Sequence, residues 1–363
     1  MKEIFETKIN LQLFAEAGDV VNTLTNGYVN AYTGADVGAD GNSLAGELKT
    51  FYDTELLENA RVEMFYAQFA KKQTLPAKHG NTVEWRKWNT FAKADKLQEG
   101  VIPSGQKFGM SSKTGAISQY GTYAAISDTL ELRAYDPVII GATEEMGASA
   151  AETQETLIRD ALLPNLNILY CDNITLADGS VAGTPTAPNA MEASATVMSL
   201  LTPKMVSKAV TKMKKDRVPT IGGKYYAVIH PSVAHDLRNS EEWIEVHKYS
   251  ATGEIFNGEI GELHNVRFIE NVFAPVLDGD YANKAGTKTY ATYFFGKDAF
   301  GIIDPEGGAL QMIVKSKEQA GGPLNQFSTV GYKFETNGAT ILYPERVLRV
   351  MSCSSYSAID EAN

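Results

Sequence analysis

Residues 136–163 have the pattern of one long amphipathic helix, and the rest of the chain must be arranged around a rod of that length. Asp136 can cap the first free N–H groups, and Pro137 fits the first turn, where a missing N–H costs nothing. Small and apolar residues then recur every three or four positions, namely Ile139, Thr143, Met146, Ala150, Thr153, Leu157 and Ala161. At about 1.5 Å per residue the helix would be roughly 40 Å long before Pro164 ends or kinks it. Few compact enzymes need such a rod, although an ordinary long core helix would show the same periodicity.

Two β-rich stretches, residues 82–88 and 116–127, precede this helix and enclose a polar tip over residues 94–109. Residues 82–88 alternate as a strand does, and the tip is rich in Gly, Pro and charged side chains. We expect a long two-stranded excursion. Because an isolated two-stranded ribbon is marginally stable in water, it must either fold back on its own sheet or lie across another copy of the protein.

The N-terminal part differs in composition from the rest of the chain. A short apolar patch that includes Phe14 is followed by six glycines before residue 50, so this segment cannot build its own core. It is either a loose tail or an arm ordered by lying on a neighbouring subunit. From Leu48 to Lys72 the apolar spacing becomes helical and predicts a helix of about six turns.

The region after the long helix predicts a second unit of mixed structure. Residues 172–202 are rich in Gly, Ala, Thr, Ser and Pro and indicate a connector. A helix is expected from Pro203 to Met213, with Thr202 as its cap and with Lys204, Lys208 and Lys212 on its outer face. These lysines indicate a solvated face or a contact with DNA or a partner. Strands and a helix should then alternate over residues 225–230, 232–248, 266–270 and 290–295.

The C-terminal part returns to β-structure over residues 310–315, 329–336 and 339–352. Asn337-Gly338 lies between two such runs and predicts a tight hairpin turn, because both residues accept positive φ. These strands need a cover, and the long helix is the obvious one. We therefore expect residues 136–163 and 310–352 to form one domain that residues 203–300 interrupt.

Charge and composition exclude several classes of function. The chain has 363 residues, 44% of them hydrophobic, with a formal net charge of -11, so its surface as a whole should repel polyanions and sequence-specific nucleic-acid binding is not expected. No run approaches the roughly 20 apolar residues of a membrane span. Two distant cysteines, Cys171 and Cys353, and the lack of a secretory signal indicate a protein kept in reducing cytoplasm.

The residues that carry chemistry in enzymes do not form a recognisable site. The nucleotide-binding Gly-Lys-Ser/Thr loop, the nucleophile elbow, the His-Glu-x-x-His zinc helix and paired Cys-x-x-Cys are missing from the sequence. The five histidines are not spaced as ligands on one helical face, and Asp278-Gly279-Asp280 lacks the ordered series of a calcium loop. Both cysteines lack neighbours that would activate a thiol. We expect no catalytic residue, cofactor or metal.

Several stretches together resemble tailed-phage major capsid proteins, specifically the N-4-type coat-protein family with the HK-97 capsid fold. They are LKTFYD at 48–53, TVEWRKW at 82–88, LQEGVIPSGQ at 97–106, QYG at 119–121, and ISD at 126–128 leading into Asp136-Pro137. The resemblance is dense over residues 48–165 and looser to about residue 350. The opening INLQLFA at 9–15 is similar to the openings of phage structural proteins from Gram-positive hosts.

The resemblance implies an α+β chain with the HK-97-type division of labour. Residues 1–50 would be an N-terminal arm, 51–71 a helix, 72–128 an extended β-hairpin loop that overlaps an adjacent subunit, and 129–202 a spine helix with its connector. Residues 203–300 would form the axial domain, 301–352 the return strands of the peripheral domain, and 353–363 a C-terminal tail. We expect eight candidate contacts between subunits: Phe14, Trp85, Arg86, Trp88, Lys93, Lys96, Glu99 and Pro103.

The implied function is geometric. Copies would close as pentamers and hexamers into an icosahedral virion shell, assembled in host cytoplasm, around double-stranded genomic DNA that is bound without sequence specificity. Scaffolding, portal and decoration proteins are possible partners. An encapsulin-like cellular compartment shares the fold and would carry enzyme cargo instead of DNA, whereas a soluble mixed α/β enzyme would be a monomer with a deep polar pocket. The triangulation number, arm trimming and cross-linking through Lys93 or Lys96 are not fixed by the sequence.

Overall fold

The computed structural model describes residues 20–21, 29–30, 64–94, 96, 99–100, 102, 105–134, 138–240, 242–244, 259–320, 324–356 and 360–363. The chain divides into two units, residues 1–60 and 61–363. In the first unit, β1 (Val20–Val21) pairs antiparallel with β2 (Val29–Asn30).

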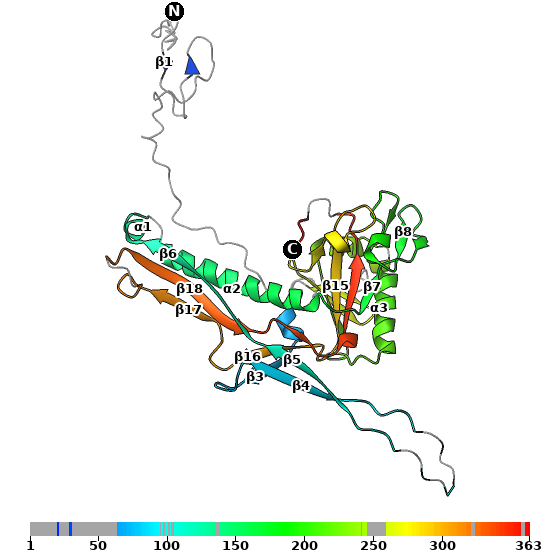
Figure 1. The fold of residues 1–363 in the computed structure, drawn as a ribbon. Helices are drawn as coiled ribbons and strands as arrows, with labels where there is room; N and C mark the ends of the chain where they lie inside the picture. Colours follow the sequence, from blue (N-terminus) through cyan, green and yellow to red (C-terminus); the bar gives the residue numbers. More distant parts are fainter. Residues whose placement is uncertain are drawn as a thin grey trace, which may run out of the picture. The chain divides into compact units, whose positions relative to one another are not determined.

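A long helix lies along a three-stranded antiparallel sheet (Figure 1). The helix is α2 (Val138–Leu162), which confirms the helix expected over 136–163, although the predicted cap at Asp136-Pro137 lies outside the described residues. The sheet has the order β17 (Gln311–Lys315), β18 (Phe327–Thr336), β6 (Ser118–Ser127). The short helix α1 (Asp128–Arg133) follows β6, and the Ser127 hydroxyl caps it by accepting from the N–H of Leu130 at 3.3 Å.

The middle of α2 packs on this sheet through small and aromatic side chains. Ala150 of α2 is fully buried against Tyr332 and Phe334 of β18. The Tyr332 hydroxyl lies 3.2 Å from both Ser149 Oγ and Thr153 Oγ1 of the helix. Ala150 and Thr153, two of the recurring positions predicted for the helix, therefore face the sheet, and α2 covers β18 as expected.

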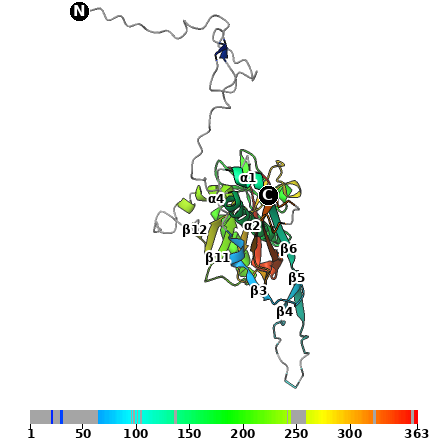
Figure 2. The same cartoon turned by 90° about the vertical axis from the view of Figure 1, so that its left-hand side faces the viewer.

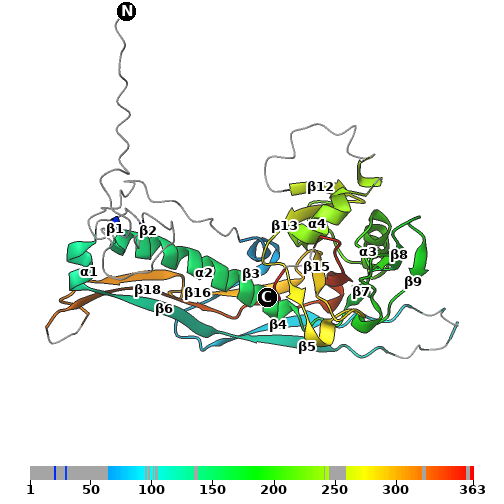
Figure 3. The same ribbon diagram turned by 90° about the horizontal axis from the view of Figure 1, so that it is seen from above.

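The second sheet has seven strands, six of them in one path. They are β12 (Glu259–Leu263), β13 (Val266–Glu270), β11 (Tyr225–Ile229), β15 (Thr289–Phe295), β20 (Val347–Ser352) and β7 (Ile168–Tyr170), with β14 (Val276–Leu277) beside β15. The helices α3 (Pro203–Lys215) and α4 (Pro231–Arg238) pack against it. Figure 3 shows that α1 lies at one end of α2, whereas the seven-stranded sheet lies at the other end together with α3 and α4.

Alternate side chains of the central strands serve two different cores. Tyr290 and Phe294 of β15 point to the core that holds α3 and α4, whereas Tyr293 and Phe295 point to the opposite core. That second core contains Ile158 and Leu162 from the end of α2. Every residue of β15 is buried, so both faces of this strand lie in a core. The helix α2 thus joins the two sheets, with its middle on one and its end on the other.

A single carboxylate connects three segments at the end of α2. Glu155 is fully buried, and its Oε1 atom accepts hydrogen bonds from the N–H of Phe65 at 3.0 Å, the N–H of Tyr66 at 3.3 Å and Nδ2 of Asn271 at 2.7 Å. Among the described residues, its Oε2 atom has no hydrogen-bond partner. Burial raises the pKa of this carboxyl group, although the three donors partly oppose the shift.

A third sheet connects the body to a two-stranded ribbon. The strand β16 (Phe300–Pro305) pairs with β19 (Thr340–Ile341) and, in parallel, with β3 (Lys71–Leu75). The ribbon consists of β4 (Thr82–Trp88) and β5 (Met110–Ala116). Figure 2 shows β4 and β5 continuing beyond β3 and β6.

Small elements complete the described part of the chain. The connector after α2 contributes a three-stranded sheet of β10 (Val197–Met198), β8 (Asn173–Thr175) and β9 (Val181–Gly183). Four short 3-10 helices are η3 (Tyr66–Phe69), η4 (Pro188–Ala190), η6 (Gly279–Tyr281) and η7 (Pro344–Arg346).

The helix predicted over 48–72 is wrong in the part that the structure describes. Residues 66–69 form only the 3-10 turn η3, and β3 begins at Lys71. The N–H groups of Phe65 and Tyr66 bond to Glu155, and Tyr66 is fully buried between Tyr293 and Phe295. Tertiary packing therefore overrides the helical spacing here. Residues 48–63 lie outside the described residues.

Strand partners differ from the prediction at two further places. Residues 118–127 do not belong to the ribbon, because β6 pairs over ten positions with β18 of the body. Asn337-Gly338 makes no hairpin, because β18 pairs with β17 and β6 while β19 pairs with β16. Gly338 has the positive φ of 62°, but the Asn337 side chain instead holds β16, where it accepts from the N–H of Ile303 at 2.8 Å.

Two boundaries also differ. The strand β20, expected in the return strands of the peripheral domain, pairs with β15 and β7 of the seven-stranded sheet. The helix α4, within the range expected over 232–248, ends at Arg238, where Ser240 Oγ donates to the carbonyl of Leu237 at 2.7 Å. Residues 242–244 are helical again, and residues 241 and 245–248 lie outside the described residues. Asp360, in the segment 353–363 that was expected as a tail, is bonded to the same region, because its carboxylate accepts from Ser232 Oγ at 2.5 Å and from the Tyr290 hydroxyl at 2.7 Å.

The pairing of β6 with β18 depends on a glycine, which gives a first testable prediction. A methyl group on Gly331 would lie 2.7 Å from the carbonyl oxygen of Thr122, so Gly331→Ala should lower the free energy of unfolding by about 1–3 kcal/mol. The matched control is Gly147→Ala in α2, where the new methyl group meets open space and a gain of up to about 1 kcal/mol is expected. Urea unfolding measures both, and equal stabilities would contradict this reading of the strand contact.

Candidate assembly interface

The ribbon presents two faces with different surroundings. The strands β4 and β5 pair in register from Thr82 opposite Ala116 to Trp88 opposite Met110, and the N–H of Asn89 extends the ladder by donating to the carbonyl of Gly109 at 2.9 Å. Because successive side chains of a strand alternate, Trp85 and Trp88 lie on opposite faces. The two tryptophans, predicted together as inter-subunit contacts, therefore have different neighbours.

One face carries a cluster of exposed aromatic rings, which we call the aromatic cluster: Trp88, Phe91 and Phe108. Trp88 and Phe108 stack with ring centroids 4.2 Å apart, and Phe91 stacks on Phe108 at 5.4 Å. The three residues remain 60%, 53% and 59% exposed. Three large rings that stack on one another and still face solvent are typical of a surface that another molecule covers.

The other face is anchored to the subunit itself. Trp85 is half-buried, and its indole ring lies over Gly301 of β16 and beside Gly115 of β5. Lys87, on the same face, lies 4.5 Å above the ring centre of Tyr343 and 3.4 Å from Glu345 Oε1. A pocket of about 300 Å³ lies beside these residues.

The ribbon is also basic, in contrast to the rest of the chain. Residues 82–116, from the start of β4 to the end of β5, contain six Lys or Arg and three Asp or Glu, although acidic residues outnumber basic ones, 44 to 33, in the whole chain. Lys93, Lys96 and Glu99 are exposed, and Arg86 pairs with Glu84 at 3.2 Å. A hydrogen bond from Ser112 and the Arg86 guanidinium lower the pKa of Glu84. A second copy of the chain, acidic elsewhere, matches this charge.

The structure brings together only some of the predicted contacts. Phe14 and Pro103 lie outside the described residues, whereas the other six all lie on the ribbon. The prediction missed Phe91 and Phe108, which complete the aromatic cluster. Their signal in the sequence was available, since both are large apolar residues in an otherwise polar excursion, but their stacking across the ribbon depends on the register of β4 and β5.

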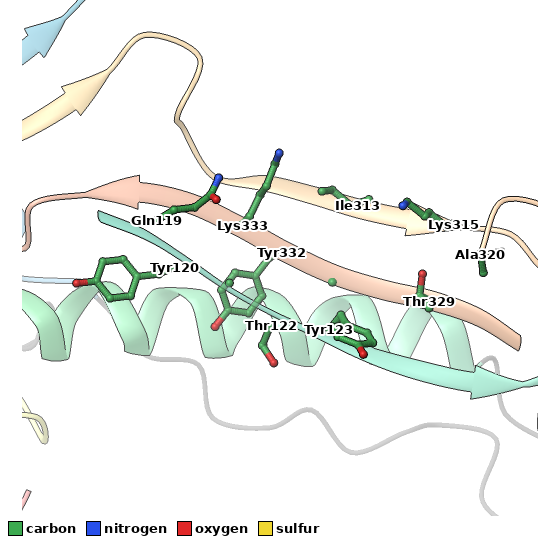
Figure 4. A pocket seen from close by; sticks show the side chains of 12 residues that line it. Gln119, Tyr120, Thr122, Tyr123, Ile313, Lys315, Ala320, Thr329, Tyr332 and Lys333 are labelled. Carbon is green, nitrogen blue, oxygen red and sulfur yellow. The ribbon is translucent and has the colours of Figure 1, made fainter. Parts of the chain in front are cut away.

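A shallow hollow of about 560 Å³ lies on the sheet β17–β18–β6 (Figure 4). Gly121 and Gly331, on neighbouring strands, leave the floor open, and Ile313, Lys315 and Lys333 stand around it. Its lining contains no histidine, cysteine or carboxylate, the groups that most often carry acid, base or metal chemistry.

Other candidate sites give no chemical centre in the described part of the chain. Within it, no three His, Cys, Asp or Glu side chains gather as metal ligands would, and no helix is both long and apolar enough to cross a membrane. The three lysines predicted on the outer face of α3 have partners in their own chain: Lys204 lies 3.7 Å from Glu242, Lys208 bonds to Asp172, and Lys212 Nζ donates to the carbonyl of Ile168 at 3.3 Å.

The two thiols give a second testable prediction. Cys171 and Cys353 are free and buried, and burial raises the pKa of Cys353 to about 11 and that of Cys171 well above its ordinary value. Because the thiolate is the reactive species, neither should react with an aqueous disulfide reagent at pH 8 in the native protein, and both should react in urea. Rapid titration of either thiol without denaturant would contradict the burial described here.

Comparisons with known proteins agree with this geometry. The model of the phage capsid protein family matches residues 111–340, well over half of the chain. No curated protein matches the chain in sequence.

Solved structures with the same fold are phage capsids. The capsid of the cyanophage P-SCSP1u is similar with a TM-score of 0.61 at 15% identity, covering 89% of this chain and 97% of that one. The capsid of the Helicobacter pylori bacteriophage KHP30 has a TM-score of 0.62 at 11% identity, covering 84% of this chain and 95% of that one. The capsid of the Ralstonia phage GP4 has a TM-score of 0.60 at 13% identity, covering 90% of this chain and 100% of that one. These likenesses confirm the predicted HK-97-type fold. With the match over residues 111–340, they show that this chain belongs to the phage capsid protein family, whose members are structural proteins and not enzymes.

Proposed function

We propose that the chain is the major capsid protein of a tailed phage of the N-4-type group, and that its copies close as pentamers and hexamers into an icosahedral shell around double-stranded DNA. The family match supports the capsid role. The single observation that carries the assembly proposal is the ribbon, because a two-stranded element with an exposed aromatic cluster needs a surface to lie on.

In this proposal the ribbon of one subunit lies across an adjacent subunit. The contacts would be Trp88 and its stacked partners at the centre, with Arg86, Lys93, Lys96 and Glu99 around them and Phe14 and Pro103 from the remaining predicted segments. Buried aromatic rings supply most of the binding free energy in such contacts, while the exposed charges set orientation and salt dependence. Trp85 makes its contacts within its own subunit and is not among these contacts.

The remaining parts would follow the family's division of labour. Residues 1–50 would act as an arm, α2 as the spine, and the seven-stranded sheet with α3 and α4 as the axial domain at the centre of each pentamer or hexamer. Scaffolding, portal and decoration proteins would join the shell during assembly in the host cytoplasm. The acidic balance of the chain suits a shell that encloses its genome without binding it tightly.

The experiment is electron microscopy of the protein expressed alone, followed by co-expression with the neighbouring genes if only small species form. Closed shells, or rings of five and six subunits, are the expected result. A protein that stays monomeric under both conditions would contradict the proposal. Shells that contain a host enzyme instead of nucleic acid would show a cellular compartment in place of a virion.

A further inference from the structure

The root of the ribbon is held by a tryptophan that fits a notch made by two glycines. A methyl group on Gly301 would lie 2.8 Å from Cζ2 and 3.0 Å from Cε2 of Trp85, and one on Gly115 would lie 2.9 Å from Cζ3. Neither glycine has a positive φ, so what these positions require is space and not an unusual backbone conformation. Any side chain in place of Gly301 or Gly115 would therefore displace the indole ring of Trp85.

The floor of this notch is itself fixed. The Asn337 side chain accepts from the N–H of Ile303 at 2.8 Å and donates to the carbonyl of Gly301 at 3.3 Å and to Thr340 Oγ1 at 3.0 Å. It therefore ties β16, on which the ring lies, to the segment before β19. In place of the predicted hairpin turn, Asn337 thus makes side-chain hydrogen bonds to β16.

Lys87, two residues beyond Trp85 on the same face of β4, makes a second contact with the body. This contact opposes rotation of the ribbon about the contact of Trp85. Lys87 reaches both the Tyr343 ring and the Glu345 carboxylate, and the Arg346 guanidinium lies 3.7 Å from the same ring. Cations over aromatic rings are attracted by the negative faces of the rings. Two contacts on one face of β4 hold the ribbon at a fixed angle, which a backbone ladder alone would leave free to twist.

We propose that Trp85 is a positioning residue that sets the direction in which the ribbon leaves its subunit and, through that direction, the curvature of the shell. The proposal rests on the function proposed above. Phe91 lies six residues beyond Trp85, about 20 Å at roughly 3.3 Å per residue. A tilt of about 10° would move it by about 3.5 Å, the full distance of a van der Waals contact. A small error at the root therefore removes or misplaces the contact made by the aromatic cluster.

The test displaces the ring without deleting it. Gly301→Ala places a methyl group in the notch. We expect wild-type particles of a single diameter, and particles of mixed sizes together with open sheets from the variant. The double variant Gly301→Ala/Trp85→Phe makes room for the methyl group and should restore one diameter. The control is Gly183→Ala in β9, where only Asn173 lies within 4 Å, at 3.8 Å, and the diameter should not change.

Particle diameter, measured by electron microscopy, is a readout that a merely structural role would not move. If Trp85 only stabilised the fold, Gly301→Ala would lower the melting temperature and the yield but leave the particles uniform, and that outcome would overturn the proposal. Should Gly301→Ala fail to fold, Trp85→Phe alone loosens the same fit, and uniform particles from it would also overturn the proposal. A wild-type chain that forms no particles would instead contradict the proposed function.

Discussion

Replacing Trp88, Phe91 and Phe108 together by serine should abolish shell formation and leave a folded subunit. Each ring is more than half exposed, so the isolated subunit loses little by the change. If burial of each ring against a second subunit contributes at least about 1.5 kcal/mol, the three together contribute about 4.5 kcal/mol, or about a 1,000-fold change in affinity for every contact. Light scattering should show the loss of particles, while circular dichroism and the melting temperature stay unchanged.

A conservative variant separates ring burial from any other effect of these substitutions. Trp88→Phe/Phe91→Tyr/Phe108→Tyr keeps three stacked rings and should still form shells, at somewhat higher protein concentration. Normal shells from the triple serine variant would show that the aromatic cluster is not an inter-subunit contact. A subunit that unfolds would show that the cluster supports its own fold.

Glu155→Ala should lower the stability of the subunit by several hydrogen bonds at once. The change removes the acceptor of three hydrogen bonds and leaves the N–H groups of Phe65 and Tyr66 and the amide of Asn271 without it. Buried donors left without partners cost about 1–3 kcal/mol each, so a loss of at least about 3 kcal/mol is expected. Glu155→Gln keeps an acceptor oxygen and should lose much less. Urea unfolding of unassembled subunits measures both.

The same pair of variants gives a dependence on pH with a definite sign. Because burial raises the pKa of Glu155 above its ordinary value of 4.5, the folded state binds the proton more tightly than the unfolded state does. The contribution of Glu155 to the stability is fully present when the pH is below its ordinary pKa, and it is lost as the pH rises through the raised pKa of the folded state. The wild-type subunit should therefore lose stability relative to Glu155→Gln over this window. Parallel stabilities of the two across it would show that the carboxyl group is not buried as described.

The elements that sequence could predict are those whose own periodicity decides them. The spacing of small and apolar residues located α2, and the alternation of Thr82–Trp88 located β4. The wrong assignment at 64–72 shows the limit, since its helical spacing is real but the N–H groups of Phe65 and Tyr66 bond to a glutamate about 90 residues away. No local pattern contains such a partner.

Strand partners were the other limit. Residues 118–127 have the composition of a ribbon strand, but Gly121 permits close approach to the backbone of Tyr332, and the ten-residue pairing with β18 follows. The sequence predicted which segment forms the candidate interface, but not which of the two faces of that segment is free to contact another subunit. A separation of three residues places Trp85 and Trp88 on opposite faces of a strand, yet only the positions of Gly301 and Tyr343 show which face the subunit keeps for itself.

The most direct measurement is a cryo-electron microscopy map of shells formed by the unmodified chain, at a resolution that shows side chains. We expect Trp88, Phe91 and Phe108 of each subunit to be buried against a neighbouring subunit, while Trp85 stays over Gly301 of its own. A ribbon folded back on its own subunit, or an aromatic cluster that faces solvent in the closed shell, would contradict the account.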